Sequence, residues 1–169
     1  IGNYISATSN KKVLYVTSEK FVDDFLNIYR KNDTSNFKAV DKFKRKYRDI
    51  DVLMIDDIQY LEIASKTQQE FFNTFNELHT QNKQIIISSD RSPDDLKKLE
   101  DRLRTRFNWG LTIDILPPDL ELRLAILDNK IKSHEIGSFV PDEVREYIAN
   151  NCTTDIRKLE GALTRVFAY

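Results

Sequence analysis

Short apolar segments alternate with segments of helical periodicity along the first two thirds of the chain, and this alternation constrains the fold most strongly. The apolar segments are rich in β-branched residues, as is typical of parallel strands that are buried on both faces. Four of them are predicted to be strands, at residues 13–17, 52–55, 85–88 and 111–115. Because strands that alternate with helices favour a parallel sheet with covering helices, we expect an α/β fold.

The segments between these strands carry apolar side chains at helical spacing. Ser18 is suited to cap a helix, and further helices are predicted over residues 36–48 and about 67–79. The apolar faces of these three helices are marked by Phe21, Phe25 and Ile28, by Phe37, Val40, Phe43 and Tyr47, and by Phe71, Phe75 and Leu78.

A tandem proline, Pro117-Pro118, ends this alternation, because such a pair cannot continue a central strand. Only helices are predicted beyond it: Asp119 to about Ser133, Asp142 to Asn150, and Thr154 or Asp155 to about Ala168. We therefore expect an α/β core over residues 1–116 and a small helical subdomain over 117–169.

Charge is distributed unevenly, since residues 1–50 hold eleven Lys and Arg against six Asp and Glu. The cations concentrate in residues 42–48. Such a cluster can be a nucleic-acid patch, a regulatory contact surface or a solvated helix face, and the helical spacing of its apolar neighbours favours the solvated face.

Composition excludes several classes of protein. Charged residues make up 31% of the chain, above the usual ~25%, and no apolar run approaches the length that spans a bilayer. Cys152 is the only cysteine and cannot form an internal disulfide, so a reducing, cytoplasmic location is the default expectation. The sequence begins at Ile1 and contains one methionine, Met54, which leads us to expect a piece of a longer chain.

The segment 52–57 carries the clearest chemical signal: four apolar residues are followed by Asp56 and Asp57. Acids at the carboxyl end of a buried parallel strand lie where open α/β folds bind ligands, and this is the Walker B arrangement. Asp56 would hold Mg²⁺, and Asp57 would orient the water that attacks a γ-phosphate. The alternative is that Asp57 only caps the following turn.

Later segments supply further polar groups. The strand predicted at 85–88 runs into Ser88, Ser89 and Asp90, and Arg102 and Arg106 lie one helical turn apart. A guanidinium group can grip phosphate oxygens, and Arg157 is a third candidate for this role. The alternative for each arginine is a solvated side chain or a weak surface ion pair.

Four segments, at residues 53–59, 88–91, 100–111 and 157–163, resemble the AAA+ domain of the bacterial chromosomal replication initiators, the DnaA family. The resemblance implies a P-loop NTPase-type parallel sheet followed by a helical lid, with an initiator-specific helical insertion over about residues 19–48. No glycine lies in a Walker A pattern, so the phosphate-binding loop and first strand are expected before residue 1.

The resemblance also implies roles for individual residues. The implied roles are Walker B acids for Asp56 and Asp57, sensor I for Asp90, a trans arginine finger for Arg106, assembly for Arg102 and sensor II for Arg157. Single-stranded DNA would contact Leu26, Lys66 and Thr67, although Leu26 could equally be a core side chain. Ala64 lies where the family often has a basic residue, which would weaken phosphate contact there.

The function implied is that of an ATP-dependent initiator whose ATP-bound protomers assemble on the origin, help to melt it and engage single-stranded DNA. ATP or ADP with Mg²⁺ would be the cofactors, with little nucleotide bound by these residues alone. The partners implied are duplex origin DNA through a further C-terminal domain, other protomers in a filament, and a replicative helicase, loader or regulators. The alternatives are a regulatory paralogue that acts by binding proteins, and a helicase loader.

Overall fold

The structure is a computed structural model, and it describes residues 1–30, 36–133 and 140–168. The chain forms two compact units, Ile1–Thr112 and Ile113–Tyr169, and each has its own hydrophobic core. This division lies four residues before the boundary expected from the sequence, after residue 116. Residues 31–35, inside the expected insertion, lie outside the described part.

The first unit contains a three-stranded parallel sheet in the order β1-β2-β3, which confirms the predicted α/β architecture. Thr17 pairs with Asp56, and Ile55 pairs with Ile87, so the carboxyl ends of the three strands meet at one edge. The elements of this unit are α1 (Gly2–Thr8), β1 (Val13–Thr17), α2 (Ser18–Arg30), α3 (Asn36–Arg48), β2 (Val52–Asp56), the 3-10 helix η1 (Ile58–Ile63), α4 (Ser65–Thr80), β3 (Gln84–Ile87), the 3-10 helix η2 (Pro93–Asp95) and α5 (Asp101–Asn108).

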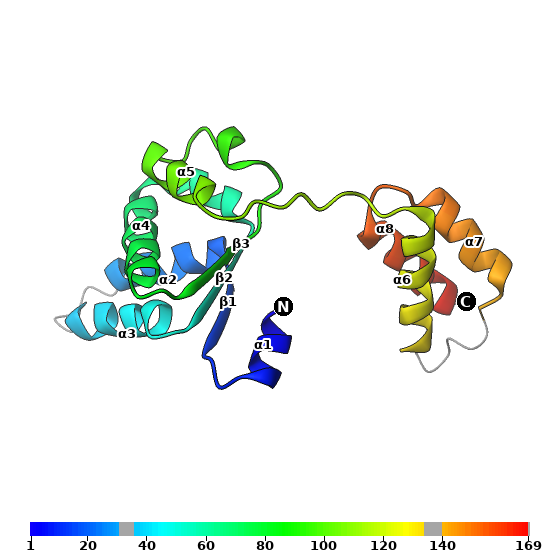
Figure 1. The fold of residues 1–169 in the computed structure, drawn as a ribbon, viewed down its shortest axis with the longest axis horizontal. Coiled ribbons are helices and arrows are strands. Elements are labelled where there is room, and N and C mark those ends of the chain that lie inside the picture. Colours follow the sequence, from blue (N-terminus) through cyan, green and yellow to red (C-terminus); the bar gives the residue numbers. More distant parts are fainter. Residues whose placement is uncertain (31–35, 134–139, 169) are drawn as a thin grey trace. The chain divides into compact units, whose positions relative to one another are not determined.

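Helices α2, α3 and α4 cover one face of the sheet (Figure 1). Phe21 of α2 is fully buried and makes edge contacts with Phe43, Tyr47 and Phe71, with ring centroids 4.8–5.3 Å apart. The aromatic cluster therefore fixes the helical layer that carries the expected insertion.

Helix α1 lies beside Met54 of β2, where a Cβ on Gly2 would come within 2.9 Å of the Met54 sulfur.

Two local expectations for these helices were wrong. Helix α2 begins at Ser18, so Thr17 is the capping residue, and its hydroxyl accepts from the Lys20 N–H at 3.2 Å. Phe37 is 87% exposed, whereas Phe43 and Tyr47 are buried. At about 100° per residue, Phe37 lies roughly 90° around α3 from the mean direction of the other apolar side chains.

The strand expected at 111–115 is also wrong, because residues 111–119 have no regular secondary structure. Leu111, Ile113 and Ile115 are 72–96% exposed. A strand needs a neighbour to satisfy its backbone, and the sheet formed by the described residues contains only β1, β2 and β3. Apolar and polar residues alternate in this segment as in a strand, but the segment does not form hydrogen bonds with the described sheet.

The second unit contains three helices among its described residues: α6 (Leu120–Lys132), α7 (Asp142–Asn151) and α8 (Ile156–Phe167). They pack around Leu127, Ala149, Leu159 and Leu163, as the predicted helical subdomain requires. Asp119 caps α6 by accepting from the Leu122 N–H, and Asp155 caps α8 by accepting from the Arg157 N–H, each at 2.8 Å.

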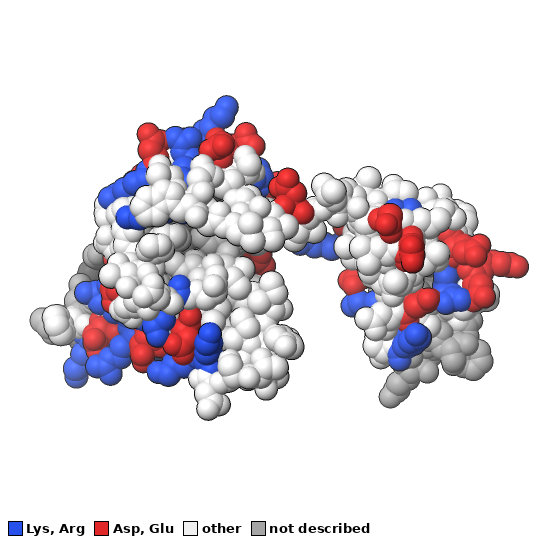
Figure 2. All heavy atoms as spheres, viewed as in Figure 1, with Lys and Arg blue, Asp and Glu red and all other residues white. Residues whose placement is uncertain are grey.

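The basic cluster lies on α3, where Lys and Arg side chains are interspersed with acidic ones (Figure 2). Arg45 pairs with Asp41 at 2.8 Å, and Arg48 pairs with Glu70 at 2.7 Å. Arg45 therefore fits the solvated face expected from the sequence, whereas the Arg48 side chain is only 14% exposed and pairs between α3 and α4. Within the described ranges, no helix is long and apolar enough to cross a membrane.

Candidate nucleotide and assembly site

Asp56 ends β2 at the carboxyl edge of the sheet, and side chains from both neighbouring strands hold its carboxylate. The Tyr15 hydroxyl of β1 donates to Asp56 Oδ2 at 2.6 Å, and the Ser88 hydroxyl, which follows β3, donates to Asp56 Oδ1. The hydrogen bond to Asp56 and the charge of that carboxylate raise the pKa of Tyr15. Asp56 is therefore held as an oriented group at the carboxyl edge of the sheet, where the sequence predicts it.

Asp57 has a left-handed backbone, with φ 56° and ψ 51°, which is uncommon for a residue other than glycine. The surrounding structure fixes this conformation: the Asp57 N–H donates to Ser88 Oγ at 3.1 Å, and the Ser18 hydroxyl donates to the Asp57 carbonyl at 2.6 Å. Gln59 Nε2 also donates to the Asp57 carboxylate, at 3.1 Å. Strained backbone of this kind is concentrated at functional sites. The left-handed conformation also turns the chain at Asp57 away from the direction of β2.

Asp90 lies three residues beyond the end of β3 and pairs with its neighbour Arg91 through two hydrogen bonds of 2.8 and 2.9 Å. The hydrogen bond from Arg91 lowers the pKa of Asp90. Ser88, rather than Asp90, is the group that the structure brings onto Asp56. The part of Asp90 as a sensor stays a prediction.

The donor set at this edge fits Mg²⁺, which prefers oxygen ligands and usually keeps several waters while binding one or two carboxylates and substrate phosphates. Asp56 and Asp57 are consecutive and supply two carboxylates, with the Ser88 hydroxyl beside them. The described residues contain no cluster of three or more His, Cys, Asp or Glu side chains, so a full cage built from protein ligands is not present there. Two carboxylates beside a hydroxyl suit a metal that also binds water and phosphate oxygens.

Helix α5 carries three arginines in different surroundings. Arg102 pairs with Glu100 at 2.5 Å and packs over the Phe72 ring of α4 at 4.5 Å, while Arg104 pairs with Asp101. Arg106 lies with its guanidinium 4.0 Å from the ring centroid of Trp109 and makes no ion pair within the described part of the chain. Of the three, Arg106 is the one whose charge stays available to an external anion.

Arg157 lies in the first turn of α8, in the second unit, and is exposed. Asp155 accepts from the Arg157 backbone N–H, so the cap fixes the backbone and leaves the guanidinium free to contact a ligand. Its assignment as sensor II stays a prediction.

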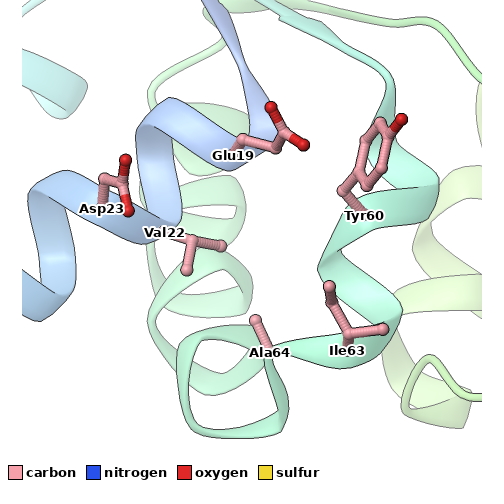
Figure 3. A pocket seen from close by; sticks show the side chains of 6 residues that line it. All are labelled: Glu19, Val22, Asp23, Tyr60, Ile63 and Ala64. Carbon is pink, nitrogen blue, oxygen red and sulfur yellow. The ribbon is translucent and has the colours of Figure 1, made fainter.

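An open groove of about 270 Å³ lies between α2 and η1 (Figure 3), close in sequence to the residues expected to contact single-stranded DNA. The groove is lined by Glu19, Val22, Asp23, Tyr60, Ile63 and Ala64. Leu26, which is half-buried, follows Val22 by one turn of α2, and Lys66, which is exposed, follows Ala64 by two residues. Thr67 is buried, so it adds no side chain to the surface.

Three residues at this site were absent from the predicted set: Tyr15, Ser88 as a contact of Asp56, and Trp109. Ser88 could have been found from strand register, because the residue after Ile87 lies opposite the residue after Ile55. Tyr15 reaches Asp56 across two strands, and sequence spacing gives no signal for that contact. Trp109 follows Arg106 by three residues, a helical spacing that could have indicated their contact.

Comparison with known proteins gives a family match for this chain. Residues 1–114 match the family model described as the bacterial DnaA ATPase domain. The chain is similar to domain III of the Thermotoga maritima replication initiation protein DnaA, with 38% identity, a TM-score of 0.88, and coverage of 99% of this chain and 68% of that one.

Two other solved structures resemble this chain to a similar degree. One is DnaA from Aquifex aeolicus bound to AMPPCP, with 32% identity, a TM-score of 0.78, and coverage of 95% of this chain and 47% of that one. The other is a replication initiator DnaA bound to AMPPCP and single-stranded DNA, with 32% identity, a TM-score of 0.81, and coverage of 98% and 48%. The chain thus spans about half the length of these two relatives.

Proposed function

This chain belongs to the bacterial DnaA ATPase domain family and has its AAA+ fold, and from that premise we propose that it is the ATPase core and helical lid of a replication initiator. Its ATP-bound protomers would assemble on origin DNA, help to melt it and bind the exposed single strand. The observation that carries the proposal is an oriented pair of acids, Asp56 and Asp57. The same unit contains Arg106, which makes no ion pair with any residue that the structure describes.

In the nucleotide site, Asp56 would hold Mg²⁺, and Asp57 would orient the attacking water. Mg²⁺, when bound, would neutralise the charge that develops on the phosphates. Tyr15 and Ser88 keep the Asp56 carboxylate in one orientation, which lowers the cost of ordering it when metal and nucleotide bind. Asp90 would sense the γ-phosphate, and Arg157 would contact phosphate from the second unit, acting as a lid.

Assembly would depend on Arg106, which we assign to the nucleotide of a neighbouring protomer. A guanidinium that reaches a phosphate in trans makes the nucleotide state of one protomer readable by the next, so hydrolysis resets the assembly. Arg102 supports this segment from within, because its contacts with Glu100 and Phe72 fix the start of α5 against α4.

Single-stranded DNA would lie along the groove between α2 and η1, with Lys66 holding phosphate and Leu26 in apolar contact. Glu19 and Asp23 on the groove wall repel phosphates, and Ala64 adds no cation. Phosphate contact would therefore concentrate near Lys66. The relative bound to AMPPCP and single-stranded DNA supports a DNA-binding role for the family.

The first test is ATP-dependent assembly of the longest natural protein that contains residues 1–169, measured by light scattering. Arg106→Ala should reduce assembly by at least tenfold, because the phosphate loses a charged contact in trans. Arg45→Ala, which removes the same charge from an exposed position on α3, should assemble normally. Undiminished assembly of the Arg106→Ala protein would exclude the trans role.

A second candidate function, a regulatory paralogue that binds proteins rather than DNA, is favoured by the acidic wall of the groove. Fluorescence anisotropy with a labelled single-stranded oligonucleotide, measured over a range of salt concentrations, separates the two. An initiator should bind with an affinity that falls steeply as salt rises, since phosphate neutralisation releases counterions. No binding even at low salt would favour the regulatory paralogue.

A further inference from the structure

Among the described residues, Arg106 contacts an aromatic ring and forms no pair with an acid. Its guanidinium carbon lies 4.0 Å from the ring centroid of Trp109, whereas Arg102 and Arg104 on the same helix are paired with Glu100 and Asp101. Stacking uses the flat face of a guanidinium and leaves the N–H donors at its edge unoccupied, while a carboxylate would occupy those donors. The contact with Trp109 thus orients Arg106 without neutralising it.

Trp109 also contacts a second ring, that of His79. Trp109 directly follows the last residue of α5, and its backbone N–H donates to the Arg106 carbonyl at 3.2 Å. The residue is 62% exposed. The ring of His79 lies 6.2 Å from it and stacks in turn on Phe75, a buried side chain of α4, at 6.1 Å with planes 12° apart. A chain of ring contacts therefore joins the indole, through His79, to the buried Phe75 of the first unit.

We propose that Trp109 is a positioning residue for Arg106: it holds the guanidinium extended and unpaired so that it can meet the phosphates of a nucleotide bound to a second copy of this chain. The inference rests on the trans role proposed for Arg106. Without the indole, the side chain of Arg106 would sample many rotamers, and ordering it on a neighbouring phosphate would cost conformational entropy.

The contact is tested directly by NMR in the chain of residues 1–169. Trp109 is the only tryptophan, so its indole resonances are unambiguous. The ring should shift the Arg106 Hδ and Hε resonances upfield and give nuclear Overhauser effects to them. Trp109→Leu should return these resonances to ordinary values, and Trp109→Phe should keep part of the shift. Arg106 resonances that are unshifted in the unsubstituted chain would overturn the proposal.

The consequence is tested by ATP-dependent assembly of the longest natural protein that contains these residues. Trp109→Leu should raise the concentration needed for half-assembly by about fivefold, the loss expected for one cation–π contact at an exposed site. Trp109→Phe should recover most of it, and unchanged thermal unfolding of both variants would show that the fold is retained.

Two results would overturn the positioning role. One is normal assembly by Trp109→Leu, and the other is assembly by Trp109→Phe that is no better than by Trp109→Leu, since any apolar side chain would then serve. Failure of the proposed function looks different: in that case Arg106→Ala itself assembles normally, whatever residue stands at position 109.

Discussion

The Asp24 carboxylate of α2 receives three donors and joins this helix to α3. Lys20 pairs with it at 2.8 Å, Lys46 donates at 2.5 Å, and the Tyr47 hydroxyl donates at 2.8 Å. Burial alone would raise the pKa of Asp24, but these hydrogen bonds outweigh burial and lower it to about 2. Burial, together with the bond to Asp24, raises the pKa of Tyr47.

Because the folded-state pKa of Asp24 lies below its ordinary value of 3.8, the ionised carboxylate stabilises the fold above that pH, and the stabilisation is lost as pH falls toward 2. Asp24→Asn should therefore lower the free energy of unfolding at pH 7 by about 1–2 kcal/mol and flatten its fall between pH 4 and pH 2. Urea unfolding at several pH values measures both effects.

Asp49→Asn is the matched control, because Asp49 forms an exposed pair with Lys12 that should contribute little. An acid dependence in Asp24→Asn equal to that of the unsubstituted chain would show that another carboxylate is responsible.

Prediction from sequence succeeds at single residues where the signal is local. The place of Asp56 and Asp57 follows from an apolar strand that runs into acids, and the structure puts them at the expected sheet edge. The contacts of Asp56 with Tyr15 and Ser88 join residues 41 and 32 positions apart, and depend on strand register and side-chain reach. Such contacts appear only once the sheet is assembled.

At the scale of elements, the same distinction holds. The predicted bounds of β1 and α3 match the structure because the pattern of apolar residues lies within each segment. The segment 111–115 has an equally good strand pattern, yet it forms none. A strand depends on a neighbour as well as on its own residues, so pattern alone overpredicts it.

Arg123 of α6 organises the second unit through two backbone carbonyls. It is 9% exposed, and its guanidinium donates to the Ala149 carbonyl at 2.7 Å and to the Pro118 carbonyl at 2.6 Å. One side chain therefore ties the end of the proline segment and the body of α7 to α6.

Arg123→Met keeps an apolar stem but leaves two carbonyls without this donor, so it should destabilise the second unit by about 2–3 kcal/mol. Hydrogen exchange should speed up for amides of α6 and α7, while amides of the sheet serve as an internal control because the first unit has its own core. Lys132→Met, at the exposed end of α6, should leave exchange unchanged. Equal protection in Arg123→Met would show that apolar packing alone holds these helices.

At the scale of the whole molecule, the sequence predicted a division of the chain into two units. The tandem proline predicted a joint, and the chain divides close to it, between Thr112 and Ile113. Each unit buries its own cluster of apolar side chains. Between them the backbone of 111–117 is exposed and lacks regular structure, which makes it the natural site for cleavage.

Limited proteolysis with thermolysin, which cuts before large apolar residues, should therefore cleave first within 111–116. Leu111, Ile113 and Ile115 are exposed on irregular backbone that can enter a protease active site, and mass spectrometry identifies the cut. Ile63 is an internal control: it is 82% exposed but belongs to η1, so it should be cut much more slowly. Both fragments should keep their helical circular dichroism, because neither core is divided by the cut. A first cut at Ile63 would contradict the prediction that 111–116 is the most accessible segment. Loss of structure in both fragments would show that the units depend on each other for folding.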